Sequence, residues 1–360
     1  MARTSGRSRW GETMEAIVLH GGQGTRLRPL THTGPKQLIK VAGKPVSQWV
    51  LEQLRDAGLR DVVIVLGDNN PQRVVDYYGD GSWLGLRVRY VYQGRARGLA
   101  DAVYRARNLV GDRFIVYLGD NVVPYDLRRM MDFRGSASLL LARVPNPQRF
   151  GVAVLRDNRV VRVVEKPREP ISDLALVGVY GFTREVFEVI ESLRPSWRGE
   201  LEITDAIQGL IDRGREVSYD IVDGWWKDTG TPDDILEANM VLLDRHASRS
   251  IRGDVVNSTV EGRVIVEEGA KVVSSRVVGP AFIGRGSEVR DSYVGPFTMV
   301  GDSCVVDESE VENTIILDGA AVRGVPLRDS IIGQGSRVVR GDRRPRAMRL
   351  VIGENSSLEV

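Results

Sequence analysis

Cysteine is almost absent from this chain of 360 residues, and histidine is rare. Cys304 is the only cysteine, so the chain can form neither an internal disulfide nor a cysteine-rich zinc site. Because such chains are typical of reducing compartments, we expect a cytoplasmic protein. Only 3 histidines are present, which leaves few imidazole groups for metal binding or acid–base catalysis.

Long apolar runs and a dominant charge are absent too. No apolar stretch reaches the roughly 18 residues of a membrane-spanning helix, so we expect no membrane partner. Residues 1–13 lack the apolar core of a signal peptide, and we expect them to be a disordered leader, with Met14 as a candidate start. The net charge is only +2 and no basic stripe follows the sequence, which argues against a nucleic-acid partner.

The remaining composition, 42% hydrophobic and 27% charged, is that of a globular protein long enough for two domains. Over residues 14–245, short Val- and Ile-rich runs alternate with stretches of helical period. This alternation predicts an α/β catalytic domain with a Rossmann-like, mostly parallel sheet and helices on both faces. The expected strands are 16–19, 62–66, 88–92, 114–118, 138–144 and 175–182. The expected helices are 46–57, 99–108, 184–193 and one that begins at Thr231 and Pro232.

The sequence past residue 251 repeats every 17 residues. Three apolar columns define the repeat: Val255, Val272, Val289 and Val306; Val260, Val277, Val294 and Val311; Val266, Ile283, Val300 and Leu317. A serine column, Ser258, Ser275, Ser292 and Ser309, keeps the same period.

The spacing of 5, 6 and 6 residues between these columns gives three corners per coil, with one apolar side chain turned inward from each face. This predicts a triangular parallel β-helix domain over 251–360, with a slip of register near 322–326. The pattern resembles the hexapeptide repeat of left-handed β-helices, and that resemblance implies the handedness.

A glycine-rich run, GGQGTRLRPLT at 21–31, is followed by Lys36. Glycines leave backbone N–H groups bare and reach positive φ, so successive amides can hold phosphate oxygens, and Arg26 and Lys36 would balance the charge. The run is neither a Walker loop nor a dinucleotide fingerprint, because no Gly-Lys-Ser/Thr is present and Leu27 replaces the third glycine. The alternative is a plain Gly-rich turn after a strand.

Two aspartates lie where an α/β sheet would place a site. Asp120 follows the expected strand 114–118, and Asp228 precedes the capped helix. Mg²⁺ prefers oxygen ligands, usually one or two carboxylates with phosphates and water. We therefore predict that Asp120 and Asp228 share a Mg²⁺ ion, although each alone is more often a turn former or a cap.

Polar residues also follow two other expected strands. Glu165 and Lys166 follow the run 160–164 and offer an acceptor for sugar hydroxyls and a cation for a phosphate. Gln93 ends the strand 88–92, where an amide can contact the edge of a base. A surface Glu-Lys pair and an exposed loop glutamine are the alternatives.

These blocks, taken in order, resemble the sugar-phosphate nucleotidylyltransferase family, and within it the thymidylyl branch in its long form with a C-terminal β-helix. Beyond the glycine run, the matching blocks are Gly98-Leu99-Ala100, LGDN at 118–121, Glu165-Lys166-Pro167, RGELEITD at 198–205 and Asp228-Thr229-Gly230-Thr231. Gln37 and the 198–205 block favour the thymidylyl branch. Ala96 and Lys40 depart from the family pattern, because both stand where proline is usual.

The resemblance implies roles for the matching residues. The catalytic residues would be Arg26, Lys36, Asp120, Lys166 and Asp228, with Asp120 and Asp228 on Mg²⁺. The nucleotide-binding residues would be Leu19, Gly21, Gly22, Gly24, Thr25, Gln37, Gln93 and Gly98, the last two at the base. The sugar phosphate would be bound by Asn121, Gly151, Glu165 and Lys166. Glucose 1-phosphate would attack the α-phosphorus of dTTP, giving pyrophosphate and dTDP-glucose, a deoxysugar (rhamnose) precursor.

Other functions stay open at this point. The enzyme could use UTP or accept several nucleotides and sugar phosphates. Acetyl transfer by the β-helix is disfavoured, because none of the 3 histidines lies in the repeat. A non-catalytic regulator that binds sugar nucleotides is disfavoured because all the charged site residues are present. The flat β-helix faces suit subunit contacts, so we expect a homo-oligomer, with a monomer as the alternative.

Overall fold

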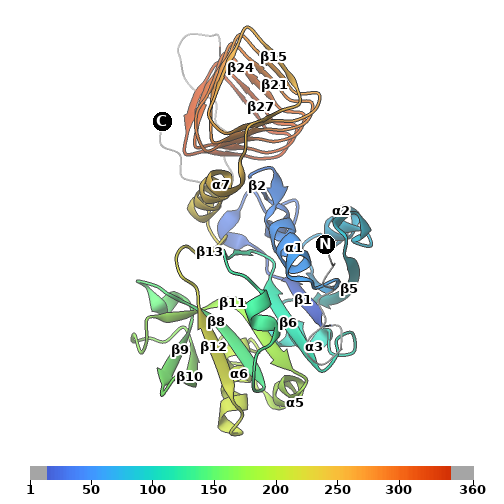
Figure 1. The fold of residues 1–360 in the computed structure, drawn as a ribbon, viewed down its shortest axis with the longest axis vertical. Coiled ribbons are helices and arrows are strands. Elements are labelled where there is room, and N and C mark those ends of the chain that lie inside the picture. Colours follow the sequence, from blue (N-terminus) through green and yellow to red (C-terminus); the bar gives the residue numbers. More distant parts are fainter. Residues whose placement is uncertain (1–13, 342–360) are drawn as a thin grey trace, which may run out of the picture. The chain divides into compact units, whose positions relative to one another are not determined.

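The structure, a computed structural model, describes residues 14–341 (Figure 1). The leader expected at 1–13 and the last part of the expected β-helix domain, 342–360, lie outside the described residues. The chain forms two compact units, each described separately below. The first comprises residues up to 23, 33–38 and 47–228; the second comprises 24–32, 39–46 and the residues from 229 onward. The predicted domain boundary between residues 245 and 251 stays a prediction.

A nine-stranded mixed sheet forms the centre of the first unit, in the order β10-β9-β11-β6-β1-β4-β5, with β8 and then β12 extending from β11 (Figure 1). Its strands are β1 (Glu15–His20), β4 (Asp61–Gly67), β5 (Arg87–Gly94), β6 (Arg113–Leu118), β8 (Ala137–Arg143), β9 (Gly151–Arg156), β10 (Arg159–Glu165), β11 (Leu174–Thr183) and β12 (Val217–Ile221). The run β6-β1-β4-β5 is parallel, as is the pair β8-β12, whereas β11 is antiparallel to β6, β8 and β9. Each strand expected from the sequence is present, and the α/β class is confirmed.

The helices of this part of the chain are α1 (Val46–Ala57), α2 (Gln72–Tyr78), α3 (Leu99–Arg105), α4 (Arg128–Met131), α5 (Glu185–Ser192) and α6 (Ile203–Asp212). Short 3-10 helices occur at η1 (Thr25–Leu27), η2 (Lys36–Leu38), η3 (Ser82–Leu84) and η4 (Pro147–Arg149). A small antiparallel pair joins β7 (Asn121–Val122) to β13 (Lys227–Asp228).

Apolar side chains cover both faces of the large sheet. Along β1, Ile17 and Leu19 belong to one buried cluster, whereas Val18 belongs to the other. The first cluster includes Ile207 of α6, and the second includes Leu51 of α1. Burial on both faces explains why the strands are continuous apolar runs rather than alternating ones, and it confirms the expected layer of helices on each face.

The second unit contains α7 (Pro232–His246), the hairpin β2 (Lys40–Val41) and β3 (Lys44–Pro45), and the C-terminal strands. The start of α7 is as predicted: the Thr231 side chain accepts a hydrogen bond from the Asp234 N–H, and the Asp234 carboxylate accepts one from the Thr231 N–H. Pro232 fills the first turn, where no N–H is needed. Within residues 14–341, no helix is long and apolar enough to cross a membrane.

The C-terminal strands form three parallel sheets that stack coil upon coil (Figure 1). One holds β14 (Ser250–Ile251), β17 (Val264–Val266), β20 (Ala281–Ile283), β23 (Thr298–Val300), β26 (Ile315–Ile316) and β29 (Ile331–Ile332). The second holds β15 (Asp254–Val256), β18 (Lys271–Val273), β21 (Glu288–Arg290), β24 (Val305–Asp307), β27 (Ala321–Arg323) and β30 (Arg337–Val339). The third holds β16 (Thr259–Glu261), β19 (Arg276–Val278), β22 (Tyr293–Val294), β25 (Glu310–Glu312) and β28 (Pro326–Arg328). The sheets are those of a parallel β-helix and are in keeping with left-handed coils.

The predicted apolar columns line the β-helix core except in the first coil, where Val255 is 37% exposed and Val260 is half-buried, and one position needs a correction. Ile316, not Leu317, pairs with Val300 and is fully buried, while Leu317 is only half-buried. The corner between β25 and β26 is one residue shorter than in earlier coils, so the period falls to 16 before the slip expected at 322–326. Two adjacent apolar residues masked this change in the sequence pattern.

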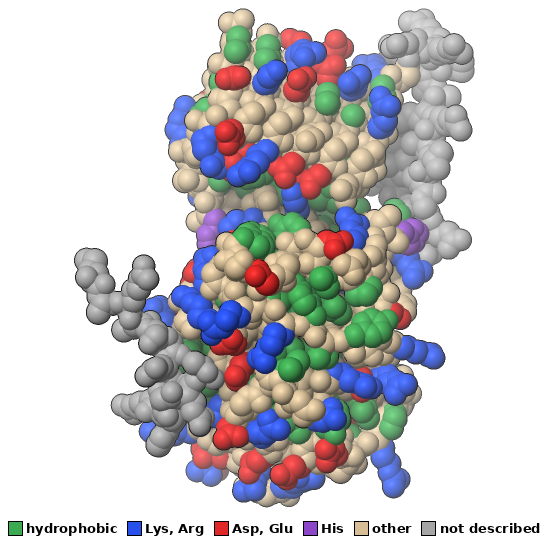
Figure 2. All heavy atoms as spheres, turned by 90° about the vertical axis from the view of Figure 1, so that its right-hand side faces the viewer, with side chains coloured by type: hydrophobic (Ala, Val, Ile, Leu, Met, Phe, Trp, Pro, Cys, Tyr) green, Lys and Arg blue, Asp and Glu red, His purple; other side chains and the backbone are tan. Residues whose placement is uncertain are grey.

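Charged side chains of both signs are interspersed on the face shown in Figure 2. The ion pairs of the described residues include Arg87 with Asp61 and Arg276 with Glu261, in which both arginines are exposed. Exposed pairs of this kind contribute little to stability, about 0–1 kcal/mol each. The folding energy therefore resides in the buried clusters.

Candidate active site

The glycine run begins directly after β1, at the carboxyl end of the parallel part of the sheet. Gly22 has φ +99°, a conformation that residues with a Cβ rarely adopt. Gly21 lies against Gly67, whose added Cβ would come within 3.2 Å of the Gly21 Cα. Leu19 is buried in the core, and its carbonyl accepts a hydrogen bond from the Gly119 N–H at 3.0 Å. At Gly21 and Gly22 the chain therefore presents backbone groups, rather than side chains, to a ligand.

The next part of the run belongs to the second unit. Gly24 has φ 59° and starts the 3-10 helix η1, which carries Thr25 and Arg26. The Thr31 hydroxyl donates to the Gly24 carbonyl at 2.8 Å, which fastens this turn. Arg26 is exposed.

Lys36 and Gln37 lie on η2 in the first unit and make different contacts. Lys36 forms an ion pair with Asp120, and both side chains are only 14% exposed. The Gln37 amide donates to the Gly21 carbonyl at 3.1 Å. Gln37 is 1% exposed, and its Oε1 has no hydrogen-bond partner among the described residues. Lys36 thus places a cation beside Asp120, and Gln37 holds the glycine turn through the Gly21 carbonyl.

The two predicted metal ligands come together through the small pair β7 and β13. Asp228 lies directly opposite Asn121, the residue that follows Asp120. Asn121 is buried: its Nδ2 donates to Asp120 Oδ1 at 3.2 Å, and its Oδ1 accepts from the Trp226 indole N–H at 3.0 Å. Two aspartates far apart in sequence therefore lie on neighbouring stretches of backbone at one end of the sheet.

This donor set fits Mg²⁺ rather than a metal held by the protein alone. Among residues 14–341, no cluster of three or more His, Cys, Asp or Glu side chains could hold a metal ion. Two carboxylates with room for phosphates and water are the ligands that Mg²⁺ commonly takes at nucleotide sites. Asp120 and Asp228 would therefore hold the ion only together with a substrate.

His20 lies immediately behind this site. It is fully buried, neither ring nitrogen has a hydrogen-bond partner in the described structure, and its ring meets Tyr78 edge-on at 6.1 Å between centroids. Burial lowers the pKa of His20 to about 3 against the opposing charge of Asp120, so the ring is neutral at pH 7. A Cβ at Gly119 would lie 2.8 Å from this ring, so only glycine fits at position 119 beside His20.

Gln93 has a fixed amide orientation. Its Nε2 donates to the Gly98 carbonyl at 3.1 Å and to Asp101 Oδ2 at 3.0 Å. Because both partners only accept, Gln93 Oε1 must point the other way, and it lies 3.1 Å from the position of a Cβ on Gly21. Gly98 has φ +105°, and a Cβ there would lie 2.3 Å from the Leu201 carbonyl oxygen. The site thus presents an acceptor, not a donor, beside the glycine turn.

Glu165 is the centre of a second cluster. Its Oε2 accepts a hydrogen bond from the Thr204 hydroxyl at 3.3 Å and would lie 3.1 Å from a Cβ on Gly151. Its Oε1 lies 3.5 Å from the Arg198 guanidinium and 3.7 Å from Lys166 Nζ. Lys166 is exposed and has φ 41°. The sequence-predicted residues Gly151, Glu165 and Lys166 are thus brought together.

Three side chains of these clusters were not among the predicted site residues: Arg198, Thr204 and Trp226. Arg198 and Thr204 lie in the 198–205 block, which matched the family but suggested no role. Trp226 precedes Lys227 and orients Asn121. Block membership was the only sequence signal for Arg198 and Thr204, and Trp226 had none, because these contacts depend on the fold.

Comparison with known proteins identifies the family of this chain. Residues 15–245 match the family of nucleotidyl transferases. Two relatives named glucose-1-phosphate thymidylyltransferase, from Streptomyces griseus and Streptomyces antibioticus, are 49% and 48% identical, and each alignment covers 96% of this chain and 99% of the relative. A crystal structure from Bacillus anthracis, described under the same enzyme name, has a TM-score of 0.60 and 36% identity and covers 66% of this chain and 97% of its own. The chain belongs to the nucleotidyl transferase family.

Proposed function

We propose that this protein transfers the deoxythymidylyl group of dTTP to glucose 1-phosphate, forming dTDP-glucose and pyrophosphate. The observation that carries this proposal is the ion pair of Lys36 with Asp120, together with the backbone of Asp228 paired to Asn121, the residue after Asp120. The enzyme name carried by the two full-length Streptomyces relatives supports the choice of substrates.

No protein nucleophile is required for this reaction. The phosphate of glucose 1-phosphate is ionised at neutral pH and can attack the α-phosphorus of the nucleotide directly, so the site has to bring two anions together and balance their charge. Lys36 is held by Asp120 in a largely buried position, where a triphosphate would give it a second anionic partner. Mg²⁺, held by Asp120 and Asp228 when bound, would supply the charge that draws the phosphate oxygens together and stabilises the departing pyrophosphate.

Gln93 limits which bases fit. Its free Oε1 accepts hydrogen bonds, so it favours a base that offers a ring N–H. Thymine and uracil carry N3–H, whereas the corresponding nitrogen of cytosine is an acceptor. The fixed amide therefore favours dTTP or UTP over CTP and treats the first two alike.

The Glu165 cluster is the proposed sugar-phosphate site. Glu165 accepts hydrogen bonds and would bind hexose hydroxyls, with Gly151 leaving room beside it. Lys166 and Arg198 are cations within 3.7 Å of the same carboxylate and would face the phosphate. Asn121, which we also place at the sugar phosphate, donates a hydrogen bond to Asp120, one of the two proposed metal ligands.

A substrate panel tests the proposal. Pyrophosphate release is measured with dTTP, UTP, CTP, ATP and GTP against glucose 1-phosphate and other hexose 1-phosphates, with and without Mg²⁺. We expect the highest kcat/KM with dTTP and glucose 1-phosphate, dependence on a divalent cation, and CTP at least about tenfold slower, since one mismatched polar contact at a buried site costs about 1–3 kcal/mol. Equal rates with UTP and dTTP would instead assign a broader uridylyl and thymidylyl activity.

Two expectations about the cellular protein stay proposals: a cytoplasmic location and a homo-oligomer. The β-helix faces remain the candidate subunit contacts. Sedimentation velocity at micromolar concentration distinguishes an oligomer from a monomer.

A further inference from the structure

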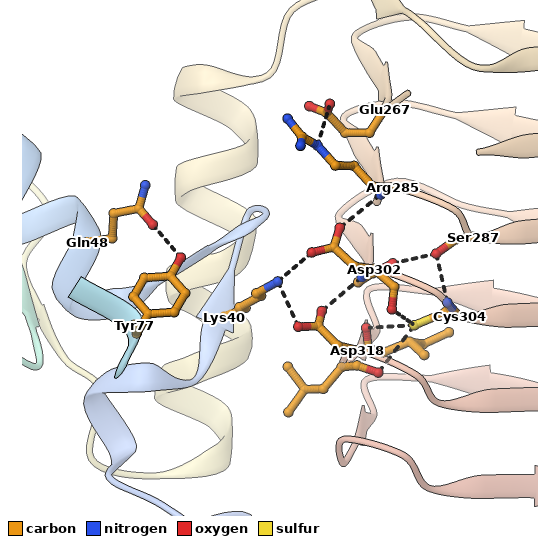
Figure 3. A network of polar contacts seen from close by, with 12 residues as sticks. Lys40, Gln48, Tyr77, Glu267, Arg285, Ser287, Asp302, Cys304 and Asp318 are labelled. Atoms are coloured by element: carbon orange, nitrogen blue, oxygen red, sulfur yellow. Dashed lines mark hydrogen bonds and ion pairs between the residues drawn. The ribbon is translucent and has the colours of Figure 1, made fainter. Parts of the chain in front are cut away.

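The hairpin β2-β3 is held to the β-helix within the second unit by Lys40 (Figure 3). Lys40 Nζ lies 2.8 Å from Asp302 Oδ2 and 2.8 Å from Asp318 Oδ2. Asp302 follows β23 and Asp318 follows β26, so the two carboxylates come from successive coils. The Lys40 side chain is only 17% exposed. One lysine therefore bridges two coils of the β-helix.

Both carboxylates are themselves fixed by the backbone of the β-helix. Asp302 Oδ1 accepts a hydrogen bond from the Arg285 N–H at 2.9 Å, and Asp318 Oδ1 accepts one from the Asp302 N–H at 2.9 Å (Figure 3). Each aspartate thus uses one oxygen for the preceding coil and one for Lys40. Carboxylates held in this way lose little conformational freedom on binding the lysine, so the pair is stronger than a mobile surface ion pair.

Two further contacts anchor the turn of the hairpin. The Ala42 N–H donates to Asn239 Oδ1 at 2.8 Å, and Asn239 Nδ2 donates to the Phe297 carbonyl at 2.8 Å. Asn239, on α7, is fully buried. Gly43, with φ +88°, lies against the Phe282 ring, which an added Cβ would meet at 2.6 Å. The hairpin is therefore held by the Lys40 ion pairs, by the hydrogen bond from Ala42 to the buried Asn239 amide, and by the close packing of Gly43 on the Phe282 ring.

The docked hairpin is close in sequence to Lys36 and Gln37 and to the segment 24–32 that carries Arg26. Lys40 follows Gln37 by three residues, and each residue spans at most about 3.6 Å, so the position of Lys40 restricts where Lys36 and Gln37 can lie. The segment 24–32, which carries Arg26, belongs to the same unit as the hairpin. Segments on both sides of 33–38 are thus grouped with the β-helix.

We propose that Lys40 is a positioning residue for the nucleotide, and that the β-helix influences nucleotide binding through the ion pair of Lys40 with Asp302 and Asp318. In this role Lys40 does not touch the substrate. It fixes the hairpin, and the hairpin limits the conformations of Lys36 and Gln37. The identity of the nucleotide rests on the proposed function, but the role of the β-helix as a brace for this segment does not.

The test compares Lys40→Met, Lys40→Arg and the double variant Asp302→Asn/Asp318→Asn with the wild-type chain. Arg276→Met is the matched control, because it removes a cation from an ion pair elsewhere on the β-helix. We expect Lys40→Met and the double variant to raise the KM for dTTP about tenfold with kcat within about twofold, the size of one charge-assisted contact. Lys40→Arg should recover most of the loss, and Arg276→Met should match wild type.

Hydrogen–deuterium exchange over residues 36–46 is the second readout and requires no substrate. We expect faster exchange in Lys40→Met than in Arg276→Met, with Ala42 among the affected amides because its N–H is bonded to Asn239. Should Lys40→Met fail to fold, Asp302→Asn alone is the milder variant, since Asp318 still binds Lys40.

The two readouts separate the outcomes. Unchanged exchange in the charge-removing variants would overturn the brace, and faster exchange with an unchanged KM would overturn its effect on the nucleotide. A wild-type chain that releases no pyrophosphate from dTTP would instead refute the proposed function, while the exchange result would still decide whether the ion pair holds the hairpin.

Discussion

The histidine next to Asp120, His20, is neutral rather than charged at pH 7. The pKa of His20 is lowered to about 3, first by burial, while the nearby Asp120 charge acts in the opposite direction. The ring therefore fills space behind the site and adds no positive charge at neutral pH. Asp120 thus has Lys36 as its cationic partner and is left for the metal ion that we propose.

His20 makes the stability of the chain depend on pH. Its pKa is lower in the folded state than its ordinary 6.5, so below pH 6.5 the unfolded chain binds a proton that the folded chain excludes. The free energy of unfolding should then fall as the pH drops from 6.5 to 5, with a slope approaching about 1.4 kcal/mol per pH unit. Chemical denaturation of the metal-free protein at several pH values measures this slope.

The variant His20→Ala should remove most of that slope even though it lowers stability at pH 7 by leaving a cavity. His32→Ala is the matched control, because His32 is exposed. A slope that is the same in wild type and His20→Ala would show that His20 does not take up the proton on unfolding.

At this scale the sequence predicted residue types better than their contacts. Lys36 was chosen for its charge beside the glycine run, and Asp120 and Asp228 for their carboxylates next to an expected strand and a capped helix. The fold pairs Lys36 with Asp120 and places the Asp228 backbone opposite Asn121. The direction of the Gln93 amide was not predictable, because it depends on Asp101 and the Gly98 carbonyl across a loop. Arg198 was missed for the same reason: its partner Glu165 lies on a distant strand.

Elements of the β-helix are tied together by side chains that bond across coils. The Ser292 hydroxyl accepts from the Ser309 N–H at 3.0 Å, and that of Ser275 accepts from the Ser292 N–H at 3.1 Å. The serine column seen in the sequence is therefore a ladder of hydrogen bonds at one corner. Ser287 and Cys304 make a similar step at another corner, where Ser287 Oγ accepts from the Cys304 N–H at 2.8 Å (Figure 3).

Cys304 provides a probe of this element. Burial, the main cause, raises the pKa of its thiol from 9.0 to about 11, so at pH 8 the thiolate that reacts with alkylating reagents is about a hundredfold scarcer than in the unfolded chain. We expect iodoacetamide to label the folded protein at least that much more slowly than the unfolded one. Mass spectrometry of the single cysteine measures the rate.

The variant Ser287→Ala should speed this labelling. It leaves the Cys304 N–H and the Gly301 carbonyl without a buried partner, which costs about 1–3 kcal/mol. Ser330→Ala is the control, because its hydroxyl only caps the Arg328 carbonyl near the surface. Equal labelling in the two variants would contradict the proposed contribution of the corner to β-helix stability.

Element prediction succeeded where one local rule decides the structure. The start of α7 was fixed by Thr231 and Pro232, and the strands by continuous apolar runs. It failed at Leu317, because two neighbouring apolar residues satisfy the same pattern in either register. Only the packing of the shortened corner selects Ile316.

At the scale of the whole molecule, the glycine run and the residues that follow it, 21–46, are divided between the two compact units. Residues up to 23 and 33–38 group with the large sheet, whereas 24–32 and 39–46 group with the β-helix. Sequence reasoning predicted a catalytic domain and an appended β-helix but gave no reason to divide this segment in this way. That division follows from long-range contacts such as those of Lys40 and Asn239.

The central claim, that Asp120 and Asp228 form one metal-dependent site for nucleotidyl transfer, is tested most directly by pyrophosphate release from dTTP and glucose 1-phosphate across a Mg²⁺ titration. Asp228→Asn and Asp120→Asn are compared with Asp223→Asn, an exposed aspartate nearby in the sequence. We expect the first two to lose about 10²- to 10³-fold in kcat/KM, the loss typical of removing one electrostatic stabiliser, and Asp223→Asn to stay near wild type. Full Mg²⁺-dependent turnover in Asp228→Asn or Asp120→Asn would contradict the claim.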